Sequence, residues 1–491
     1  MLEKAPEEQK GGNTFYTAGA YRCAIPSPAL DSLLSIPVHN VAESVQPESD
    51  REPLYGAGDF RADMERVTKG ECDEGLTTAL VEGSWDAVRW LSQRHGVRFR
   101  LSYERQAYSV EGKFRFWGGL FLSTQGGGKG LVEQQHASVR RNGIRVLYNV
   151  HVTGLVTRFD GTAVEGVDVC LADGRRGWIE ATGGVVLACG GFESDRDKRA
   201  RHLGPSWLAA HVRGTPHNTG DFLSLVEPVR AKLSGEASFG GCHATCWDAL
   251  TDADIGDANL TNQFTKSGYP LGIIVNRQGR RFVDEGEDMR NYTYAKIGKA
   301  ILDQPRSIGI QIYDSKTIPL LRREEYASGI VKRPIEADTL EELAKRLKLQ
   351  DAEAEAAFLE EIHNFNAAVR SFERDNGDRK FDPSVRDGRG TAELPIPKSN
   401  WAQQINKGPF LAVETTCGIT FTFGGLSIDP MTASVLSAKD EGASIEGLYA
   451  AGECTGGLFY HNYPGGSGLT SGTVFGRKAG RSAALAALEK Q

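Results

Sequence analysis

The spacing of hydrophobic residues changes along the chain, and each spacing predicts a different kind of element. Hydrophobic residues recur every three or four positions within 60–97 and 131–141, which predicts amphipathic helices. From residue 144 onward they alternate with polar residues, and Asp-Gly turns separate the alternating runs. We therefore expect a three-stranded antiparallel meander over 144–179 and a buried strand in the apolar run 185–189.

The middle of the chain, from about residue 201 to 395, has a different character. It contains a hairpin signal at Asn276–Gly279 and two helical stretches, of which the first begins with a capping box at Asp338–Glu341. The charged and then proline-rich stretch 374–400 predicts a linker that returns the chain to its first domain. We therefore expect an inserted domain between two parts of another one.

A glycine-rich segment near the C-terminus carries the clearest chemical signal. A short apolar strand leads into Gly447-Leu-Tyr-Ala-Ala-Gly-Glu453, and a second glycine cluster precedes a helix rich in small residues over 473–488. Glycines in such a place let backbone amides approach a planar ring and its phosphates, and a helix N-terminus favours an anion. We expect Glu453 to accept hydrogen bonds from the hydroxyl groups of a cofactor.

Composition and charge narrow the classes of function. The 491 residues suffice for two domains, and the 58 glycines cluster at predicted strand ends, which favours a cofactor-binding protein. The net charge of −7 implies no basic face for a nucleic acid, and the apolar runs are too short to span a bilayer. Because the N-terminus is charged and has no signal-peptide core, we expect a cytoplasmic protein. The eight cysteines are scattered, so we expect reduced thiols and no zinc or iron–sulfur site.

The order of strand, Ala-Ala-Gly-Glu, Gly-Gly, Pro-Gly-Gly and small-residue helix resembles the closing flavin site of the fumarate reductase and succinate dehydrogenase flavoprotein superfamily. A meander before a buried parallel strand is also usual in flavin-binding doubly wound domains. The expected fold is α/β. A doubly wound FAD-binding domain is formed by 1–200 and 396–491, and an α+β capping domain is inserted over 201–395.

The N-terminal segment matches the first half of that flavin site. An acidic residue at the end of the second strand holds ribose hydroxyls in dinucleotide folds, and Glu3 precedes Gly-Gly-Asn-Thr in the superfamily order. Relatives with covalent flavin carry a histidine where this chain has Asn13, so the resemblance implies non-covalent FAD. The Gly-x-Gly-x-x-Gly loop normally lies about twenty residues before the acid, for which there is no room here. We therefore expect the first strand and its glycine loop to be missing, and a flavin-free, inactive or binding-only protein is an alternative.

The same resemblance suggests catalytic residues. The hairpin at 273–285 resembles the segment whose second arginine transfers the active-site proton, which is Arg281 here. Arginine is a poor base at its ordinary pKa and needs a partner to relay the proton, and the sequence assigns none. His243 matches a carboxylate-binding histidine, although a structural role is equally compatible with its neighbouring glycines. Thr420 and Tyr463 stand where fumarate reductases carry a second histidine and a substrate-binding arginine, so we do not expect a plain fumarate reductase.

Four stretches resemble the tricarballylate dehydrogenase group more closely, and they begin at residues 12, 212, 281 and 460. The implied reaction dehydrogenates a carbon–carbon bond of a small carboxylate, of the tricarballylate to cis-aconitate type. A hydride would pass to flavin N5, Arg281 would accept the proton, and a separate acceptor would take the electrons. The turn that follows Tyr463 is also similar to that of 3-ketosteroid dehydrogenases, where a tyrosine polarises a ketone, and this is the alternative.

The expected site draws on residues from the whole chain. The substrate would be bound by His243, Arg290, Thr420, His461 and Tyr463. FAD would be held by Glu3, Gly11, Gly12, Asn13, Thr14, Gly19, Val152, Gly190, Asp221, Gly452, Glu453, Ser467, Gly468, Leu469 and Thr470.

Overall fold

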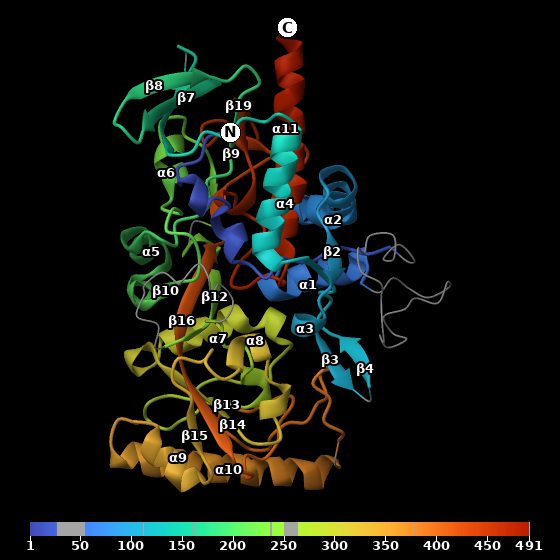
Figure 1. The fold of residues 1–491 in the computed structure, drawn as a ribbon, viewed down its shortest axis with the longest axis vertical. Coiled ribbons are helices and arrows are strands. Elements are labelled where there is room, and N and C mark those ends of the chain that lie inside the picture. The colour runs from blue at the N-terminus through green and yellow to red at the C-terminus, as the bar shows by residue number, and fades with distance from the viewer. Residues whose placement is uncertain are drawn as a thin grey trace.

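The computed structural model describes residues 1–26, 55–110, 112–159, 161, 163–235, 238–249, 264–377 and 379–490. The molecule is elongated, and the long strand β16 (Phe410–Thr422) runs from its centre to its lower end (Figure 1). No helix within these described ranges is long and apolar enough to cross a membrane.

Two of the three-stranded sheets lie at the top of the molecule in Figure 1. The first is an antiparallel meander of β6 (Val150–Thr157), β7 (Val164–Leu171) and β8 (Arg176–Glu180). In the second, β19 (Ser444–Ala450) pairs in parallel with β9 (Val185–Leu187) and antiparallel with β18 (Ser434–Leu436). The long helices of this half are α2 (Glu74–His95), α4 (Gly127–Arg141) and α11 (Ser467–Glu489).

The lower half is organised around β16. The strands of its sheet are β10 (His211–Val212), β12 (Cys242–Asp248), β13 (Ile273–Val275), β14 (Gly309–Tyr313) and β15 (Ile335–Ala337). Its helices are α7 (Tyr294–Leu302), α8 (Arg323–Tyr326), α9 (Leu340–Arg346) and α10 (Ala352–Asn376). α9 and α10 lie across the lower end of the sheet, because Leu343, Phe358 and Phe365 pack into one core with Ile273 and Ile310 (Figure 1).

Shorter elements connect these layers. The remaining helices are α1 (Ala57–Thr68), α3 (Tyr103–Gln106), α5 (Arg196–Leu203) and α6 (Asp221–Val226). The remaining strands are β1 (Ala20–Tyr21), β2 (Phe99–Leu101), β3 (Ala107–Val110), β4 (Lys113–Phe116), β5 (Leu122–Thr124), β11 (Leu233–Ser234) and β17 (Gly425–Leu426).

The structure confirms the meander and the helical stretches but moves several boundaries. The predicted helix over 60–97 is two helices, because Lys69 and Gly70 adopt positive φ angles and Asp73 caps the start of α2. The meander begins at Val150 rather than residue 144. The segment before it pairs elsewhere, through a parallel bridge between Leu147 and Leu2.

Three further details differ from the sequence expectations. In β9 only Leu187 is buried, so the apolar run does not form a strand covered on both faces. The helix that was expected to begin with a capping box at Asp338 is α9. Its N-cap residue is Thr339, whose side chain accepts a hydrogen bond from the backbone N–H of Glu342. The second arm of the expected hairpin forms no strand with β13: the two share a single bridge, between Val275 and Arg281, and β13 pairs with β14 instead.

Candidate functional site

A cavity of about 1100 Å³ is lined by residues from both halves of the molecule. One end, here called the meander end, is lined by Glu3 and Val152 beside the β6–β8 sheet. The other end, called the arginine end, is lined by His243 and Arg290 where β12 and β16 meet the segment before α7. The cavity is therefore long enough to adjoin both the N-terminal segment and the lower sheet.

Glycines give this cavity a flat, open face. Gly468, Gly472 and Gly476 recur every four residues on α11, and all three line the cavity together with Gly452. A Cβ added at Gly452 would meet no atom within 4 Å, and one added at any of the three helix glycines would meet nothing nearer than 3.6 Å. A planar group can thus lie against the backbone, and the N–H groups of the first turn of α11 favour negative charge nearby.

Two buried carboxyl groups lie close together at Asn13. Its Nδ2 donates to Glu193 Oε1 at 2.7 Å and to Glu453 Oε2 at 3.2 Å, and Asn218 Nδ2 makes the same two contacts at the same distances. Glu453 Oε1 also accepts the backbone N–H of Thr422 at 2.9 Å. Burial, and then the neighbouring Glu193, raises the pKa of Glu453 well above its ordinary value. The pair therefore retains a proton at pH values where an exposed carboxyl group has lost it.

Arg290 is the buried cation at the arginine end. Its Nη1 donates to Ser267 Oγ at 2.7 Å, its Nη2 donates to the Arg105 backbone oxygen at 2.6 Å, and its guanidinium lies 4.7 Å from the ring centre of Trp117. No carboxylate in the described part of the chain forms an ion pair with it, and its Nε has no hydrogen-bond partner there. A buried cation without an anion is costly, so this end of the cavity favours an anionic ligand group.

Ser267 connects Arg290 to a fully buried carboxylate. Glu325 Oε2 accepts from Ser267 Oγ at 2.6 Å and from the Ser267 backbone N–H at 2.8 Å. Glu325 Oε1 accepts from Arg322 at 3.1 Å and from Arg105 at 3.2 Å. Burial acts to raise the pKa of Glu325, but Arg322 and Arg105 outweigh it and hold that pKa below its ordinary value. Glu325 is therefore a charged group at neutral pH.

The same network reaches the surface through Arg105. Its Nη1 pairs with Glu324 at 2.8 Å, and the Glu324 side chain is 36% exposed. Polar groups within hydrogen-bond distance of one another thus connect Arg290 with solvent. A guanidinium gives up a proton only with difficulty, and such a connection can restore it.

Four rings form a second wall of the arginine end, here called the aromatic wall: His243, Tyr294, Phe421 and Tyr463. The His243 ring stacks on Phe421 with 5.4 Å between centres and contacts Tyr294 and Tyr463 edge-on at 4.6 and 5.1 Å. Burial, and then Arg213, lowers the pKa of His243 well below its ordinary value, and burial raises the pKa of Tyr463 to about 12. The aromatic wall is therefore uncharged near pH 7.

Arg213 adds a second cation to this end of the cavity. It donates to Thr420 Oγ1 at 3.2 Å and to the Tyr16 backbone oxygen at 3.0 Å. Burial, and then the charge of Arg105, lowers the pKa of Arg213 to about 10, so it still carries its charge at pH 7. Thr420 thus contacts Arg213 through its hydroxyl group.

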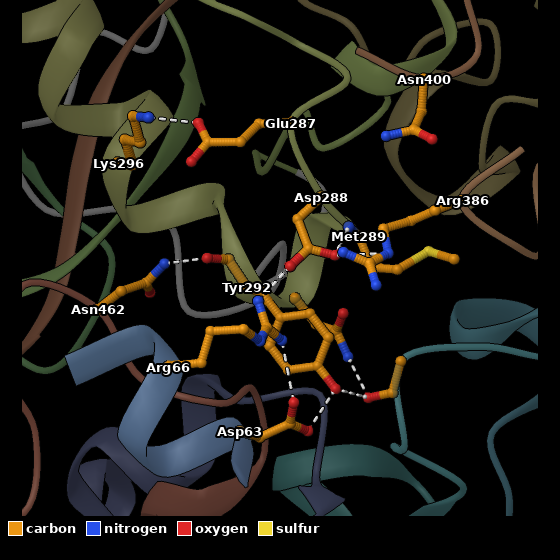
Figure 2. Close-up of polar contacts among 12 residues, drawn as sticks. Asp63, Arg66, Glu287, Asp288, Met289, Tyr292, Lys296, Arg386, Asn400 and Asn462 are labelled. Atoms are coloured by element: carbon orange, nitrogen blue, oxygen red, sulfur yellow. Dashed lines mark hydrogen bonds and ion pairs between the residues drawn. The ribbon is translucent and has the colours of Figure 1, made fainter. Parts of the chain in front are cut away.

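A polar cluster holds the turn that precedes α7 (Figure 2). The Tyr292 hydroxyl donates to Asp63 Oδ2 at 2.6 Å, and the Asn462 side chain donates to the Tyr292 backbone oxygen. Arg66 of α1 forms an ion pair with Asp288 in the segment before that turn. These contacts join α1, the turn that carries Arg290 and the segment that carries Tyr463.

Most residues expected from the sequence to bind FAD or substrate line the cavity; the exceptions are Gly19, His461, Ser467 and Thr470, and the expected catalytic residue Arg281 does not line it either. His461 pairs with Glu71 at 2.5 Å, and nearly half of its side chain is exposed. Thr470 Oγ1 donates to the Arg22 backbone oxygen at 2.7 Å, and Ser467 Oγ donates to the Pro464 oxygen at 2.6 Å. These side chains stabilise the segments around the cavity.

The structure does not bring Arg281 to the cavity. Its side chain is buried 5.2 Å from the ring centre of Phe365 on α10, and it pairs with Glu285 at 2.6 Å. Its Nη1 donates to the Ile396 backbone oxygen at 2.7 Å. Arg281 is thus fully engaged within the lower half, and Arg290 is the arginine of this segment that lines the cavity.

Several cavity residues were not among those expected from the sequence. They include Arg105, Arg213, Ser267, Tyr294 and Phe421. Arg213 lies in the Arg-Gly-Thr-Pro-His-Asn-Thr-Gly stretch and Phe421 directly follows Thr420, so both were close to recognised motifs. Ser267 and Arg105 carry no local signal, because their contacts join distant parts of the chain.

Comparison with known proteins identifies the class of protein. A family model described as a FAD binding domain matches residues 41–469, so the chain belongs to this family and FAD is its cofactor. The solved structure of 3-ketosteroid delta1-dehydrogenase from Sterolibacterium denitrificans covers 99% of this chain and 94% of its own, with a TM-score of 0.70 and 19% identity. That likeness shows a shared mixed α/β fold.

Two relatives illustrate the range of the family. The chain is 27% identical over 436 residues to the probable fumarate reductase Ifc3 of Shewanella frigidimarina. The aligned region covers 88% of this chain and 65% of that protein. It is 30% identical over 459 residues to 4-oxocyclohexanecarboxylate 2-dehydrogenase of Sinomonas cyclohexanicum. That aligned region covers 87% of this chain and 73% of the dehydrogenase. The chain spans 36% to 65% of the length of the first relatives that it matches.

The residues of the cavity fit FAD. The glycine face of α11 leaves room for a planar ring, and the cavity continues from there to the meander end. Glu3 lies directly after the isolated bridge between Leu2 and Leu147 and lines that end of the cavity. Glu193 Oε2 is buried without a hydrogen-bond partner among the described residues, beside Asn13 and Glu453. An extended ligand rich in hydroxyl groups suits this combination of features.

Proposed function

We propose that this chain is a FAD-dependent oxidoreductase that adds or removes two hydrogens at a carbon–carbon bond beside a carboxylate. The observation that carries the proposal is Arg290, a buried cation with no carboxylate partner among the described residues, which lines the same cavity as the glycine face of α11. An anionic substrate at Arg290 would compensate its charge. The relatives named as fumarate reductase and cyclohexanecarboxylate dehydrogenase act on carboxylates by name, which supports the same class.

The proposal assigns separate tasks to cofactor and protein. FAD, held non-covalently by Glu3, Asn13, Glu453 and the glycine face, supplies hydride acceptance or donation at its ring. The protein side chains bind the carboxylate and orient the carbon–carbon bond between Arg290 and the aromatic wall, which line the same end of the cavity. Electrons leave to, or arrive from, a separate partner. Residues 201–395 serve as the capping domain of a doubly wound FAD-binding domain, and β16, which follows them in the chain, pairs with the strands of their sheet.

We assign the proton transfer to Arg290 in place of Arg281. Saturation of the carbon–carbon double bond adds a hydride to one carbon and a proton to its neighbour. Dehydrogenation removes a hydride and a proton from the same two carbons. Arg290 faces the cavity, and Ser267 Oγ at 2.7 Å leads from it to Glu325. This path restores or removes the proton of the guanidinium, which is a weak acid by itself.

Paired substitutions test this assignment. Arg290→Gln should lower turnover by roughly 10²- to 10⁴-fold, the usual contribution of a proton-transfer group, while the purified protein keeps its flavin absorbance. Arg281→Lys keeps a charge beside Glu285 and should retain turnover within a few-fold. Wild-type turnover in Arg290→Gln, or loss of turnover in a flavin-loaded Arg281→Lys protein, would refute the assignment.

A second candidate is dehydrogenation of a 3-ketosteroid or another enone, with Tyr463 polarising the ketone. It is favoured by the position of Tyr463 in the cavity and by burial, which raises its pKa to about 12 and keeps its proton available for donation. Tyr463→Phe should then abolish turnover of ketones and leave that of carboxylates without a ketone intact. A tricarboxylate of the tricarballylate type remains one member of the carboxylate class to be tested.

A further inference from the structure

The turn that carries Arg290 is held from outside the cavity. Arg290 and Tyr292 are the two ends of a short 3₁₀ turn before α7, and the backbone N–H of Tyr292 donates to the Met289 oxygen at 2.9 Å. Arg290 lines the cavity, whereas Tyr292 is not among the described residues that line it. Figure 2 shows the Tyr292 hydroxyl next to Asp63 of α1. Because the residues of such a tight turn move together, contacts that hold Tyr292 also hold the backbone of Arg290.

Several polar contacts converge on Tyr292. Its hydroxyl lies 2.6 Å from Asp63 Oδ2 and 2.8 Å from the Gly118 backbone oxygen, and it accepts a hydrogen bond from Arg22 Nη1 at 3.3 Å. The guanidinium groups of Arg66 and Arg22 lie 4.5 and 5.2 Å from the centre of its ring. Asp63 pairs with the same two arginines, at 2.9 and 3.2 Å. Arg22, Asp63 and Tyr292, here called the Asp63 cluster, therefore fix one another in place.

Arg22 connects the Asp63 cluster with the glycine turn before α11. Arg22 is fully buried, its Nε donates to the Gly465 oxygen at 2.9 Å, and its backbone N–H donates to the Gly466 oxygen at 3.2 Å. Gly465 and Gly466 line the cavity and directly precede the glycine face of α11. The Gly465 N–H donates to the backbone oxygen of Asn291, which lies between Arg290 and Tyr292, at 3.0 Å. The Asp63 cluster thus contacts both the glycine turn and the turn that carries Arg290.

The proposed reaction depends on the distance between these two turns. The flavin ring would lie against the glycine face, and the Arg290 guanidinium must reach the carbon atom that gains or loses the proton. A misplacement of a catalytic group by about 1 Å can lower a rate on the order of 100-fold. Contacts that fix the two turns relative to each other therefore affect the rate without touching FAD or substrate.

We propose that Arg22, Asp63 and Tyr292 are positioning residues that set the distance between the Arg290 guanidinium and the flavin ring. They act through Arg290, and none of them is among the described residues that line the cavity. This inference rests on the proposed function, since it takes Arg290 as the proton-transfer residue.

A single-turnover measurement on the FAD-loaded protein tests the inference. The flavin is photoreduced without oxygen and mixed with fumarate, acrylate or cis-aconitate, and the return of the visible flavin absorbance gives the rate constant. Tyr292→Phe removes the hydroxyl and keeps the ring, so it should lower this rate constant roughly 10- to 100-fold while the protein keeps its flavin. Asp63→Asn keeps the shape of the side chain and should lower it by a similar factor, which covers the case in which Tyr292→Phe fails to fold. A wild-type rate constant in either flavin-loaded variant would overturn the inference.

Tyr313→Phe is the matched control. Tyr313 of β14 is fully buried, its hydroxyl donates to Gln311 Oε1 at 2.7 Å, and it is not among the described residues that line the cavity. The variant loses the same kind of buried hydrogen bond, so its rate constant should stay within about twofold of wild type. An equal loss in Tyr313→Phe and Tyr292→Phe would indicate a general effect of lost stability and would also overturn the inference.

A double variant separates positioning from a purely structural role. If Tyr292 acts through Arg290, the protein with both Arg290→Gln and Tyr292→Phe should be no slower than Arg290→Gln alone, within about twofold. A loss equal to the product of the two single losses would overturn the inference and leave the proposed function intact. A wild-type rate constant in Arg290→Gln, or a wild-type flavin that none of the three acids reoxidises, would overturn the proposed function and the inference with it.

Discussion

Replacing Glu325 by Gln is expected to destabilise the protein far more than the same change at its neighbour Glu324. Glu325 is fully buried and accepts two hydrogen bonds from Ser267 and one each from Arg105 and Arg322. A glutamine keeps the shape but leaves two guanidinium groups without their shared anion. Breaking a buried ion pair in this way costs about 3–5 kcal/mol. Glu324 is 36% exposed and makes one ion pair, so Glu324→Gln should cost no more than about 1 kcal/mol.

Urea unfolding at pH 7 measures the free energy of unfolding of the wild type and of both variants. A series of such measurements at different pH values tests the direction of the pKa shift of Glu325. The pKa of Glu325 is lowered in the folded protein, so its stabilisation is present above the unfolded value of about 4.3 and is lost as pH falls through the folded value. The difference between wild type and Glu325→Gln should therefore be constant near neutral pH and shrink below about pH 4. Equal costs for the two variants at pH 7 would refute the reasoning, because it depends on burial of one carboxylate and exposure of the other.

Two further predictions concern the cofactor end of the cavity. Glu453 has a raised pKa in the folded protein, so the free energy of unfolding of the wild type should fall as pH rises above about 4.3. Glu453→Gln should remove this pH dependence in urea unfolding. Parallel pH profiles of the two proteins would contradict the prediction. Gly128→Ala should weaken FAD binding measured by fluorescence titration, because the added Cβ would lie 2.1 Å from the Thr14 oxygen and displace the segment that carries Asn13. Gly58→Ala, in the first turn of α1 with open space around the position, is the control and should leave FAD affinity unchanged. An equal loss of FAD affinity in both variants would contradict the argument.

The parts of the fold and site that could be predicted from the sequence depend on local patterns. The alternation in β6–β8 is a property of neighbouring residues, and the meander follows from it. Glu453 and Gly452 line the cavity as expected, because a strand followed by a glycine loop places them at a strand end. The raised pKa of Glu453 could not be predicted, since it arises from burial and then from Glu193, which is distant in sequence.

The arginine end was harder to predict because long-range contacts decide it. Arg281 and Arg290 lie in one segment, and nothing local shows that Arg281 turns towards Glu285 and Phe365 while Arg290 turns towards Ser267. The relay through Glu325 joins residues that are distant in sequence, so no spacing rule reveals it.

A crystal structure of the FAD-loaded protein with a small carboxylate such as succinate bound tests the central claim most directly. The account predicts that a carboxylate oxygen lies within hydrogen-bond distance of the Arg290 guanidinium, about 3 Å, and that the neighbouring carbon–carbon bond lies beside the flavin ring. A carboxylate bound away from Arg290 would contradict it.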